Sequence, residues 1–423
     1  GGTSLHIAIK RGYKETALLL IQKGADVTIK DKKGFNPLYY AVTSKMDSVV
    51  TAILNKGIEA DIFDASVLGD LERVKFLIGK NPKLVTAKHP FDRSPLHFAA
   101  ECNRVEVMKY LMRKGAKIDF QDIEGLRPLN LAASAGALEA AELLIRKGAA
   151  IGPLPVEEKV IGKYYGDLRF EVSEQKIRET TESGSYSYTP LYSAVSNNQI
   201  AIADLLIRAG ADVNIWGCKF GESNRIFEPP LHVAVRNNYK EMAEFLLKKG
   251  ADPSIKSNHG KTAFSEVALP PSVKEEIGIL LLDYGLDPNA KASDGNATML
   301  HCAATNGMTK LVSAMLDRGG DPLIGKPIES AIINGHKEVV EILVSRKPEV
   351  LKGERGQSAL RTAVSFYKPE ILEFLLDHIP NILNVNINEA MQKALSNGYV
   401  EAAEVFFAKD LKLPPIPAAT ALY

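Results

Sequence analysis

Apolar residues recur along this chain at helical spacing in pairs of short segments, and residues 94–122 show the pattern most clearly. Ser94 and Pro95 favour the start of a first helix, because the hydroxyl can cap free backbone N–H groups and Pro lacks only a donor that would have no partner there. Gly115 favours the end of a second helix, after a turn at Asn103. The apolar face of this predicted helix pair is formed by Leu96, Ala99, Ala100, Val107, Met108, Leu111 and Met112.

This unit repeats with a fixed period. Leu96 and Leu129 are 33 residues apart, and so are Leu5 and Leu38. Between a helix-ending glycine and the next Pro-Leu pair, residues such as 117–122 are predicted to form an extended finger. Anchors equivalent to Leu96 stand at Leu5, Leu38, Leu129, Leu191, Leu231, Phe264, Leu300, Ile328, Leu360 and Met391. Helix-ending glycines stand at Gly24, Gly57, Gly148, Gly210, Gly250, Gly285 and Gly319.

The period and the local sequences at residues 4–6, 94–97 and 230–232 resemble the ankyrin repeat, whose signature is T-P-L-H-x-A. The resemblance covers nearly the whole chain. It implies an all-α ankyrin-repeat solenoid of about twelve helix-turn-helix repeats, with β-hairpin-like fingers and one inserted segment. In such a solenoid each repeat buries its apolar face against its neighbours.

Three departures from the period divide the chain. Ala41 and Ala65 lie 24 residues apart, nine short of the period, so the third repeat has no finger and a gap in the row of fingers is expected there. Gly148 and Leu191 lie 43 residues apart, where a regular repeat has 14, and the connection before Leu231 is also long. We therefore divide the chain into N-terminal ankyrin repeats at 1–57, repeats beginning with the finger-less one at 58–151, an insertion at 152–184, C-terminal repeats at 185–409 and a Pro-containing tail at 410–423.

The composition narrows the classes of partner. The chain has 52 basic and 51 acidic residues and a formal net charge of +1, so no overall field attracts nucleic acid or an anionic membrane. No apolar run reaches the length of a membrane span, no signal peptide opens the sequence, and the three cysteines form no C-x-x-C pair. We expect a cytoplasmic protein, or a secreted effector in the cytosol of a host cell. The start at Gly1, inside a repeat and without Met, is interpreted as that of a fragment.

The histidines invite a metal or catalytic interpretation, but their positions favour a structural one. His6, His97, His232 and His301 share one place in the repeat. In ankyrin repeats the imidazole at this place typically hydrogen-bonds within the turn and to the adjoining repeat. The four histidines are a repeat length or more apart and lack the spacing of metal ligands.

The remaining motifs indicate no enzyme. Residues 320–327, G-D-P-L-I-G-K-P, nearly match a phosphate-binding loop, but Pro327 offers no hydroxyl to Mg²⁺ and the stretch follows a helix-ending glycine rather than a strand. The sequence contains no nucleophile elbow, no H-E-x-x-H and no glycine-rich dinucleotide loop. We predict no catalytic, cofactor-binding or metal-binding residue.

The resemblance implies that the partner is another protein, because ankyrin repeats commonly bind through finger tips and inner helices. This pattern selects Lys10, Arg11, Phe35, Phe91, Arg93, Glu101, Leu126, Tyr186, Tyr188, Arg225, Arg236 and Asn237. The two long connections add the aromatic residues Tyr164, Tyr165, Phe170, Trp216, Phe220 and Phe227. Aromatic and Arg side chains dominate interface energies, so the partner site is expected near both connections.

Several alternatives stay open. The tyrosines of the insertion either anchor a partner or only tie the insertion to its neighbours. The lysines around Lys32 suit an ordinary solvated face as well as a binding face. The whole chain is interpreted as a monomeric binding module, as the substrate-recognition part of a larger enzyme, or as the cytosolic ankyrin domain of a membrane protein.

Overall fold

The computed structural model of the chain describes residues 2–152, 189–218, 227–267, 274–291, 297–379 and 387–409. Most of the predicted insertion and all of the predicted tail lie outside these ranges. So do the candidate binding residues Tyr164, Tyr165, Phe170, Tyr186, Tyr188, Phe220 and Arg225.

Within the described ranges the chain forms twelve successive helix pairs, and one pair begins with a 3₁₀ helix. The predicted all-α repeat architecture is therefore confirmed. The chain divides into two compact units, one of Gly1–Ala234 with Lys248–Ala251 and the other of Val235–Leu247 with Asp252–Tyr423.

The first unit contains α1 (Ser4–Lys10), α2 (Lys14–Gln22), α3 (Pro37–Thr43), α4 (Asp47–Leu54), α5 (Ile62–Leu68), α6 (Leu71–Lys80), the 3₁₀ helix η1 (Pro82–Thr86), α7 (Pro95–Glu101), α8 (Val105–Arg113), α9 (Pro128–Ala135), α10 (Leu138–Arg146), α13 (Pro190–Ser196), α14 (Ile200–Arg208), β1 (Gly217–Cys218) and β2 (Phe227–Glu228). The two units divide within the pair α15 (Pro230–Arg236) and α16 (Lys240–Lys248). The second unit continues with η2 (Ala263–Glu266), α17 (Glu275–Asp283), α18 (Met299–Thr305), α19 (Thr309–Asp317), α20 (Pro327–Asn334), α21 (Lys337–Arg346), η3 (Pro348–Leu351), α22 (Glu354–Ser365), α23 (Pro369–His378), α24 (Asn388–Ser396) and α25 (Val400–Ala408).

The pair α7 and α8 shows why these residues form helices. Ser94 is the N-cap of α7, and the ring Nδ1 of His97 accepts a hydrogen bond from the Ser94 backbone N–H at 3.1 Å. Pro95 takes the first helical position, where its missing N–H does no harm. After α8, Gly115 has a φ of +96°, a conformation that residues with a side chain rarely adopt. The predicted start and end of this pair are confirmed.

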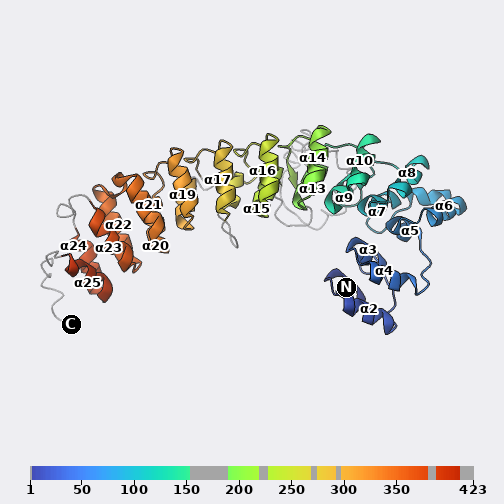
Figure 1. Cartoon of the computed structure of the whole chain (residues 1–423), viewed down its shortest axis with the longest axis horizontal. Coiled ribbons are helices and arrows are strands. Elements are labelled where there is room, and N and C mark those ends of the chain that lie inside the picture. Colours follow the sequence, from blue (N-terminus) through green and yellow to red (C-terminus); the bar gives the residue numbers. More distant parts are fainter. Residues whose placement is uncertain are drawn as a thin grey trace, which may run out of the picture. The chain divides into compact units, whose positions relative to one another are not determined.

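The inner helices of the first unit stack in chain order, with α1 on α3, α3 on α5, α5 on α7, α7 on α9 and α9 on α13 (Figure 1). The stack is anchored by Leu5, Leu38, Leu96, Leu129 and Leu191, each 1% exposed or less. Burying one such side chain contributes about 1.5–3 kcal/mol. Because α9 packs directly on α13, the stack continues past residues 153–188.

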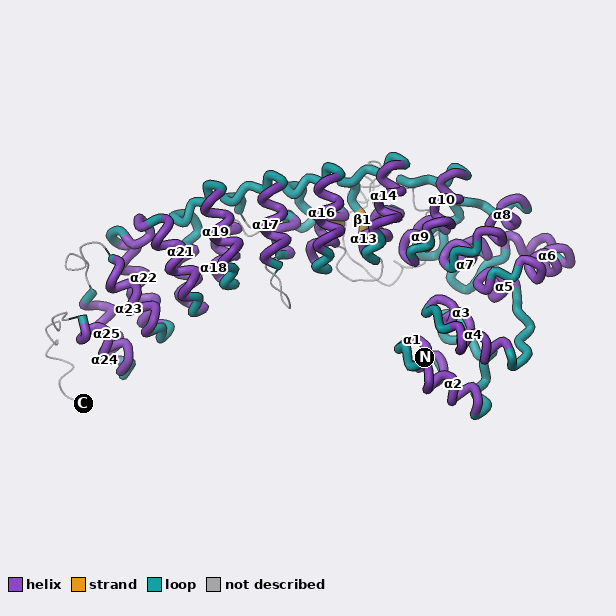
Figure 2. The backbone as a smooth tube through the Cα atoms, viewed as in Figure 1, coloured by secondary structure: helices purple, strands orange, loops and turns teal. Residues whose placement is uncertain are grey.

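In the second unit, α18 packs on α20, α20 on α22 and α22 on α24, while the outer helices α17, α19, α21, α23 and α25 form a parallel row of contacts (Figure 2). Residues 320–327 connect α19 to α20, and Pro327 is the first residue of α20. This stretch links two helices, so it is a finger and not a phosphate-binding loop. No helix in the described ranges is both long and apolar enough to cross a membrane.

The finger-less third repeat begins directly at α5. The Asp61 carboxylate caps this helix by accepting the backbone N–H groups of Phe63 and Asp64, each at 2.9 Å. The expected gap in the row of fingers is bridged, because the His89 ring lies 3.0 Å from the Gly34 carbonyl oxygen through its Nε2. A side chain at Gly34 would clash, since a Cβ there would lie 2.8 Å from the Pro90 ring.

Candidate protein-binding surface

Three successive fingers of the first unit, placed before α3, α7 and α9, carry the described candidate residues of this unit's inner surface. The fingers comprise residues 31–36, 88–93 and 117–126. The candidate residues are Phe35, Phe91, Arg93 and Leu126. Two groups of side chains surround them, an aromatic cluster and a polar network.

The aromatic cluster consists of Phe35, Tyr39, Tyr40, Phe63, His89, Phe91 and Phe98. At its centre the Phe35 ring is stacked between Tyr39, at 4.2 Å between ring centroids, and His89, at 4.7 Å. Phe35 is 7% exposed, so most of its surface is used to join the first two fingers. Phe91 stands at the edge of the cluster, half-buried and 6.1 Å from Phe35. Stacked and edge-to-face pairs of this kind stabilise the arrangement by about 0.5–1.5 kcal/mol each.

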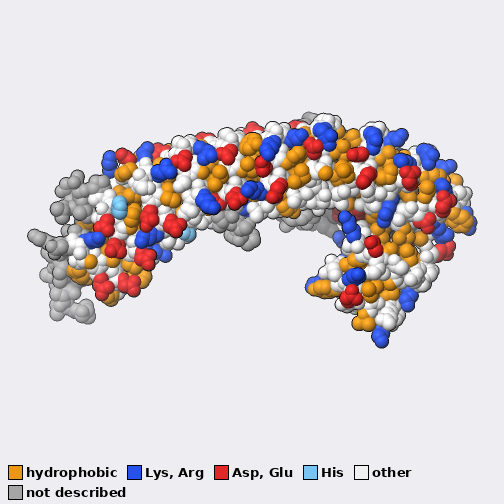
Figure 3. All heavy atoms as spheres, viewed as in Figure 1, with side chains coloured by type: hydrophobic (Ala, Val, Ile, Leu, Met, Phe, Trp, Pro, Cys, Tyr) orange, Lys and Arg blue, Asp and Glu red, His pale blue; other side chains and the backbone are white. Residues whose placement is uncertain are grey.

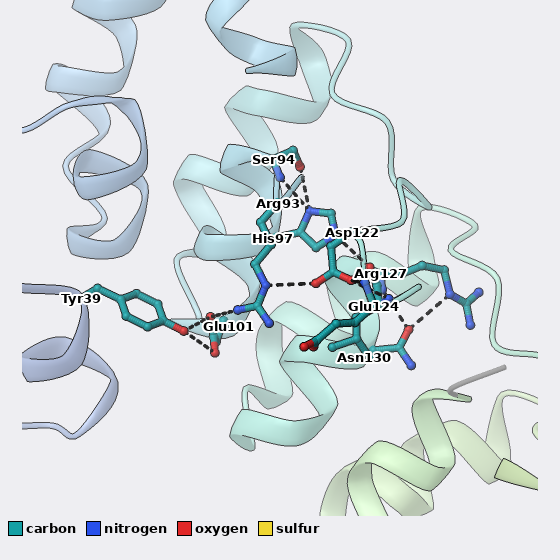
Figure 4. Close-up of polar contacts among 10 residues, drawn as sticks. Tyr39, Arg93, Ser94, His97, Glu101, Asp122, Glu124, Arg127 and Asn130 are labelled. Carbon is teal, nitrogen blue, oxygen red and sulfur yellow. Dashed lines mark hydrogen bonds and ion pairs between the residues drawn. The ribbon is translucent and has the colours of Figure 1, made fainter. Parts of the chain in front are cut away.

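The polar network consists of Tyr39, Arg93, Glu101 and Asp122, which come from two fingers and two inner helices (Figure 4). The Tyr39 hydroxyl lies 3.0 Å from both carboxylate oxygens of Glu101 and donates to them. Arg93 lies between the two acids: its Nη1 is 3.6 Å from Glu101, and its Nε donates to Asp122 at 3.0 Å. The other Asp122 oxygen accepts the backbone N–H groups of residues 124 and 126 at 2.9 Å.

Burial sets the electrostatics of this network. The Arg93 and Glu101 side chains are 12% and 18% exposed, and Asp122 is fully covered. Burial raises the pKa of Asp122 to about 6, although Arg93 opposes this shift. Burial also raises the pKa of Glu101. Burial disfavours the charge of Arg93, but Glu101 and the other neighbours outweigh it and raise the Arg93 pKa. One guanidinium is thus shared by two carboxylates, which fixes all three side chains.

The histidine at the signature position is structural, as predicted. The Nδ1 of His97 accepts hydrogen bonds from Ser94, so its Nε2–H donates to the Leu126 carbonyl oxygen in the next finger, at 3.1 Å. His6 makes the equivalent contacts, to Thr3 and to the Phe35 carbonyl oxygen. Within the described residues, no three His, Cys, Asp or Glu side chains are close enough together to hold a metal ion.

Of the other described candidates, Lys10 contacts the first finger, and the rest lie apart from the three fingers. Lys10 makes a salt bridge to Asp31 at 2.9 Å, while Arg11 and Asn237 are exposed in turns. Trp216 and Phe227 are half-buried where β1 pairs with β2. In the second unit, Arg236 makes a 3.2 Å salt bridge to Glu266. The structure therefore brings together Phe35, Phe91, Arg93, Glu101 and Leu126.

One buried side chain at the root of the insertion was not selected from the sequence. Arg127 is 1% exposed, and its two terminal nitrogens donate to the carbonyl oxygens of Ala150 and Gly152 at 2.7 and 2.9 Å. It stands at the position of Ser94, and Asn130 replaces the histidine three residues later. The signal for it was this departure from the signature in the last repeat before the insertion. Arg127 holds the chain where the insertion begins.

Models of a known protein family match the repeats along most of the chain. A family model described as "Ankyrin repeats (3 copies)" matches residues 1–64, 62–153, 231–326, 272–354 and 328–413, and one described as "Ankyrin repeats (many copies)" matches 191–247. A solved structure titled "Crystal structure of human ASB11 ankyrin repeat domain" aligns with 68% of this chain and all of that one, at 20% identity and a TM-score of 0.35.

Curated relatives match over shorter stretches. Potassium channel AKT2/3 of Arabidopsis thaliana is 30% identical over 126 residues, which is 30% of this chain and 12% of the channel. Palmitoyltransferase ZDHHC13 of Homo sapiens is 30% identical over 134 residues, 29% of this chain and 21% of that protein. Protein phosphatase 1 regulatory subunit 12A of Rattus norvegicus is 32% identical over 107 residues, 23% of this chain and 10% of the subunit. The aligned part thus spans about a fifth or less of each of these relatives.

Proposed function

Because the chain belongs to the ankyrin repeat family, whose repeats are protein-interaction modules, we propose that it binds another protein through the fingers and inner helices of its first unit. Phe91, Arg93 and Leu126 would contact the partner, with Phe35 and Glu101 holding them from beneath. The insertion at 152–184, with its tyrosines and Phe170, would extend the same site.

The observation that carries the proposal is the set of contacts that join the three fingers. Arg93 of the second finger is held by Glu101 of α7 and Asp122 of the third finger, while Phe35 of the first finger is stacked on His89 of the second. A surface whose side chains are already fixed loses little conformational entropy when a partner binds. Phe91 and Leu126 are half-buried on this support, so their remaining apolar surface is available to a partner.

A single aromatic substitution tests this proposal. Phe91→Ala removes a predicted contact at the edge of the cluster, while Phe76→Ala removes a 49% exposed aromatic ring from the outer helix α6 and serves as the matched control. Proteins retained by the immobilised wild-type chain are identified, purified and titrated against the three chains. We expect Phe91→Ala to weaken binding by about 2 kcal/mol, a factor of roughly 30, and Phe76→Ala to leave it unchanged. Equal affinity of wild type, Phe91→Ala and Phe76→Ala would mean that the partner does not bind at Phe91.

A second role is recognition within a larger protein. It is favoured by the alignment with a palmitoyltransferase and a potassium channel, of which the chain covers 21% and 12%. The repeats would then select a substrate for an enzyme, or form a cytosolic domain of a membrane protein. The complete reading frame distinguishes these cases from a separate adaptor or effector.

The remaining parts of the proposal concern the surroundings of the chain. We propose that it acts as a monomer in the cytoplasm or in the cytosol of a host cell, without catalytic turnover and without direct contact with nucleic acid or membrane. The near balance of 52 basic and 51 acidic residues supports the proposed lack of contact with nucleic acid and membrane. Acidic and basic side chains are also interspersed over the face in Figure 3. Nucleotide hydrolysis or proteolysis by the purified chain, abolished by a point mutation in it, would overturn the non-catalytic part.

A further inference from the structure

A pocket of about 310 Å³ lies beside the bases of the second and third fingers. It is lined by Val85, Thr86, Lys88, Ser94, Lys117 and Phe120. These residues come from η1, from the two fingers and from the N-cap of α7. The pocket is therefore built between two repeats, on elements that the stack holds in place.

The inner part of the pocket is firmly supported. Val85 and Ser94 are 4% and 6% exposed. The Phe120 ring is half-buried and stands edge-on to the buried His97 ring, 6.0 Å away between centroids. Val85 is almost fully covered, so the half-buried Phe120 ring presents most of the apolar surface of these two residues, which suits an apolar side chain of a partner.

The rim of the pocket is positively charged. Lys117 is exposed, and within the described residues its side chain makes no hydrogen bond or salt bridge. Lys88 lies 5.0 Å from the centre of the Phe120 ring and 3.3 Å from Asp92, with the two side chains of this pair 53% and 41% exposed. Such an exposed pair is weak, so Lys88 can turn to another anion. Among the described residues, no acidic side chain lines the pocket.

We propose that this pocket binds an acidic segment of the partner protein, in which an apolar side chain enters between Val85 and Phe120 and flanking Asp or Glu residues meet Lys88 and Lys117. The inference rests on the proposed function and names the chemistry of the partner. The volume lies at the lower end of the range for small-molecule sites, and the rim is formed by exposed side chains, so one side chain and its neighbours fit the space. Lys88 and Lys117 select for acidic residues on either side of the apolar residue in the partner segment.

The inference is tested with random peptides displayed on phage and selected against the full chain. We expect enrichment of peptides with an apolar residue flanked by Asp or Glu. An enriched peptide is then titrated against the wild-type chain, Lys88→Glu, Lys117→Glu and the control Lys56→Glu. Lys56 is an exposed lysine of the same unit that does not line the pocket. Each reversal at the pocket should weaken binding by about tenfold or more through like-charge repulsion, and Lys56→Glu should have no effect.

Changes in the peptide separate the contribution of its acidic residues from that of its apolar residue. Replacing its acids by Gln or its apolar residue by Ser should each lower the affinity, and added salt should weaken the acidic peptide more than the Gln peptide. Enriched peptides without acids, no enrichment, or binding that survives both charge reversals would overturn the inference. If the natural partner still binds and is lost with Phe91→Ala, the proposed function stands although the pocket has been excluded.

Discussion

Single side chains of this protein tie one repeat to the next. The ring of His97 is fully buried and joins Ser94 at the start of its own helix to the Leu126 carbonyl oxygen in the next finger. Burial lowers the pKa of His97 to about 3, so the ring stays neutral at physiological pH. A neutral ring can accept through one nitrogen and donate through the other, as this position requires.

His97→Ala should therefore act on stability. The substitution leaves the Ser94 N–H and the Leu126 carbonyl oxygen without this partner in a buried place, so we expect a loss of about 1–3 kcal/mol in the free energy of unfolding. Urea unfolding measures this loss, and His259→Ala, which removes an exposed histidine, is the control. Partner affinity, measured well below the melting temperature, should stay close to wild type. An unchanged unfolding curve together with lost binding would contradict the structural role.

Asp122 should make stability depend on pH. Its pKa is about 6 in the folded protein and ordinarily 3.8, so between these values the folded state keeps a proton that the unfolded state has lost. The contribution of this group is fully present below about pH 4 and is lost as the pH rises through about 6. Asp122→Asn cannot titrate. The free energy of unfolding is measured for wild type and for Asp122→Asn at each pH. The difference, wild type minus variant, should fall by at most about 3 kcal/mol from pH 4 to 7. A difference that is constant with pH would show that the carboxylate titrates normally.

At the scale of elements, neighbouring fingers contact one another as the helices do. The third repeat has no finger, and the fingers on either side meet through His89 and Gly34. Before the insertion, Arg127 takes over the link that a histidine makes in regular repeats. The helix stack continues through both irregularities, because α3, α5 and α7 stack in order and α9 packs on α13.

Removing the insertion should therefore leave the fold intact and weaken binding. Residues 152–184 are replaced by a short finger like residues 117–124, which shortens the spacing between Leu129 and Leu191 from 62 to 37 residues, close to the period of 33. Circular dichroism should show the helix content of the remaining repeats. If aromatic residues of the insertion anchor the partner, affinity should fall by about 2 kcal/mol, or roughly 30-fold. A folded variant that binds as well as wild type would limit the site to the fingers before it.

At the scale of the whole molecule, stability is distributed along the stack. The chain divides into two compact units, and within each unit neighbouring helix pairs pack on one another. In such repeat proteins stability is close to a sum of repeat and nearest-neighbour terms, so a local defect need not reach distant repeats.

Leu96→Ala should destabilise the first unit alone. Leu96 is fully buried in α7, and its truncation should cost about 2–5 kcal/mol. Hydrogen exchange followed by mass spectrometry should show faster exchange in peptides around α7 and unchanged exchange in peptides from α20 to α23. Leu54→Ala, at a leucine that is 39% exposed, should have a much smaller effect. Equal loss of protection in both units would indicate a single cooperative unit.

The repeat architecture could be predicted from the sequence because its causes are local and recur. The anchors at Leu38, Leu96 and Leu129, the cap at Ser94 and the left-handed Gly115 each depend on a few neighbouring residues, and the period repeats them. The structural role of His97 was also predictable, since the motif places it at a cap.

Only the tertiary structure decided how the fingers meet. Phe35 was expected to face a partner, but it is buried between Tyr39 and a histidine 54 residues away. Arg93 was selected as a partner contact, and the structure holds it between Glu101 and Asp122. These contacts join side chains from different fingers and helices. The sequence by itself determined the repeating unit and its anchors, because those follow from short-range spacing. The exposure, charge environment and mutual contacts of the finger residues depend on how neighbouring repeats pack, and no short-range pattern encodes that.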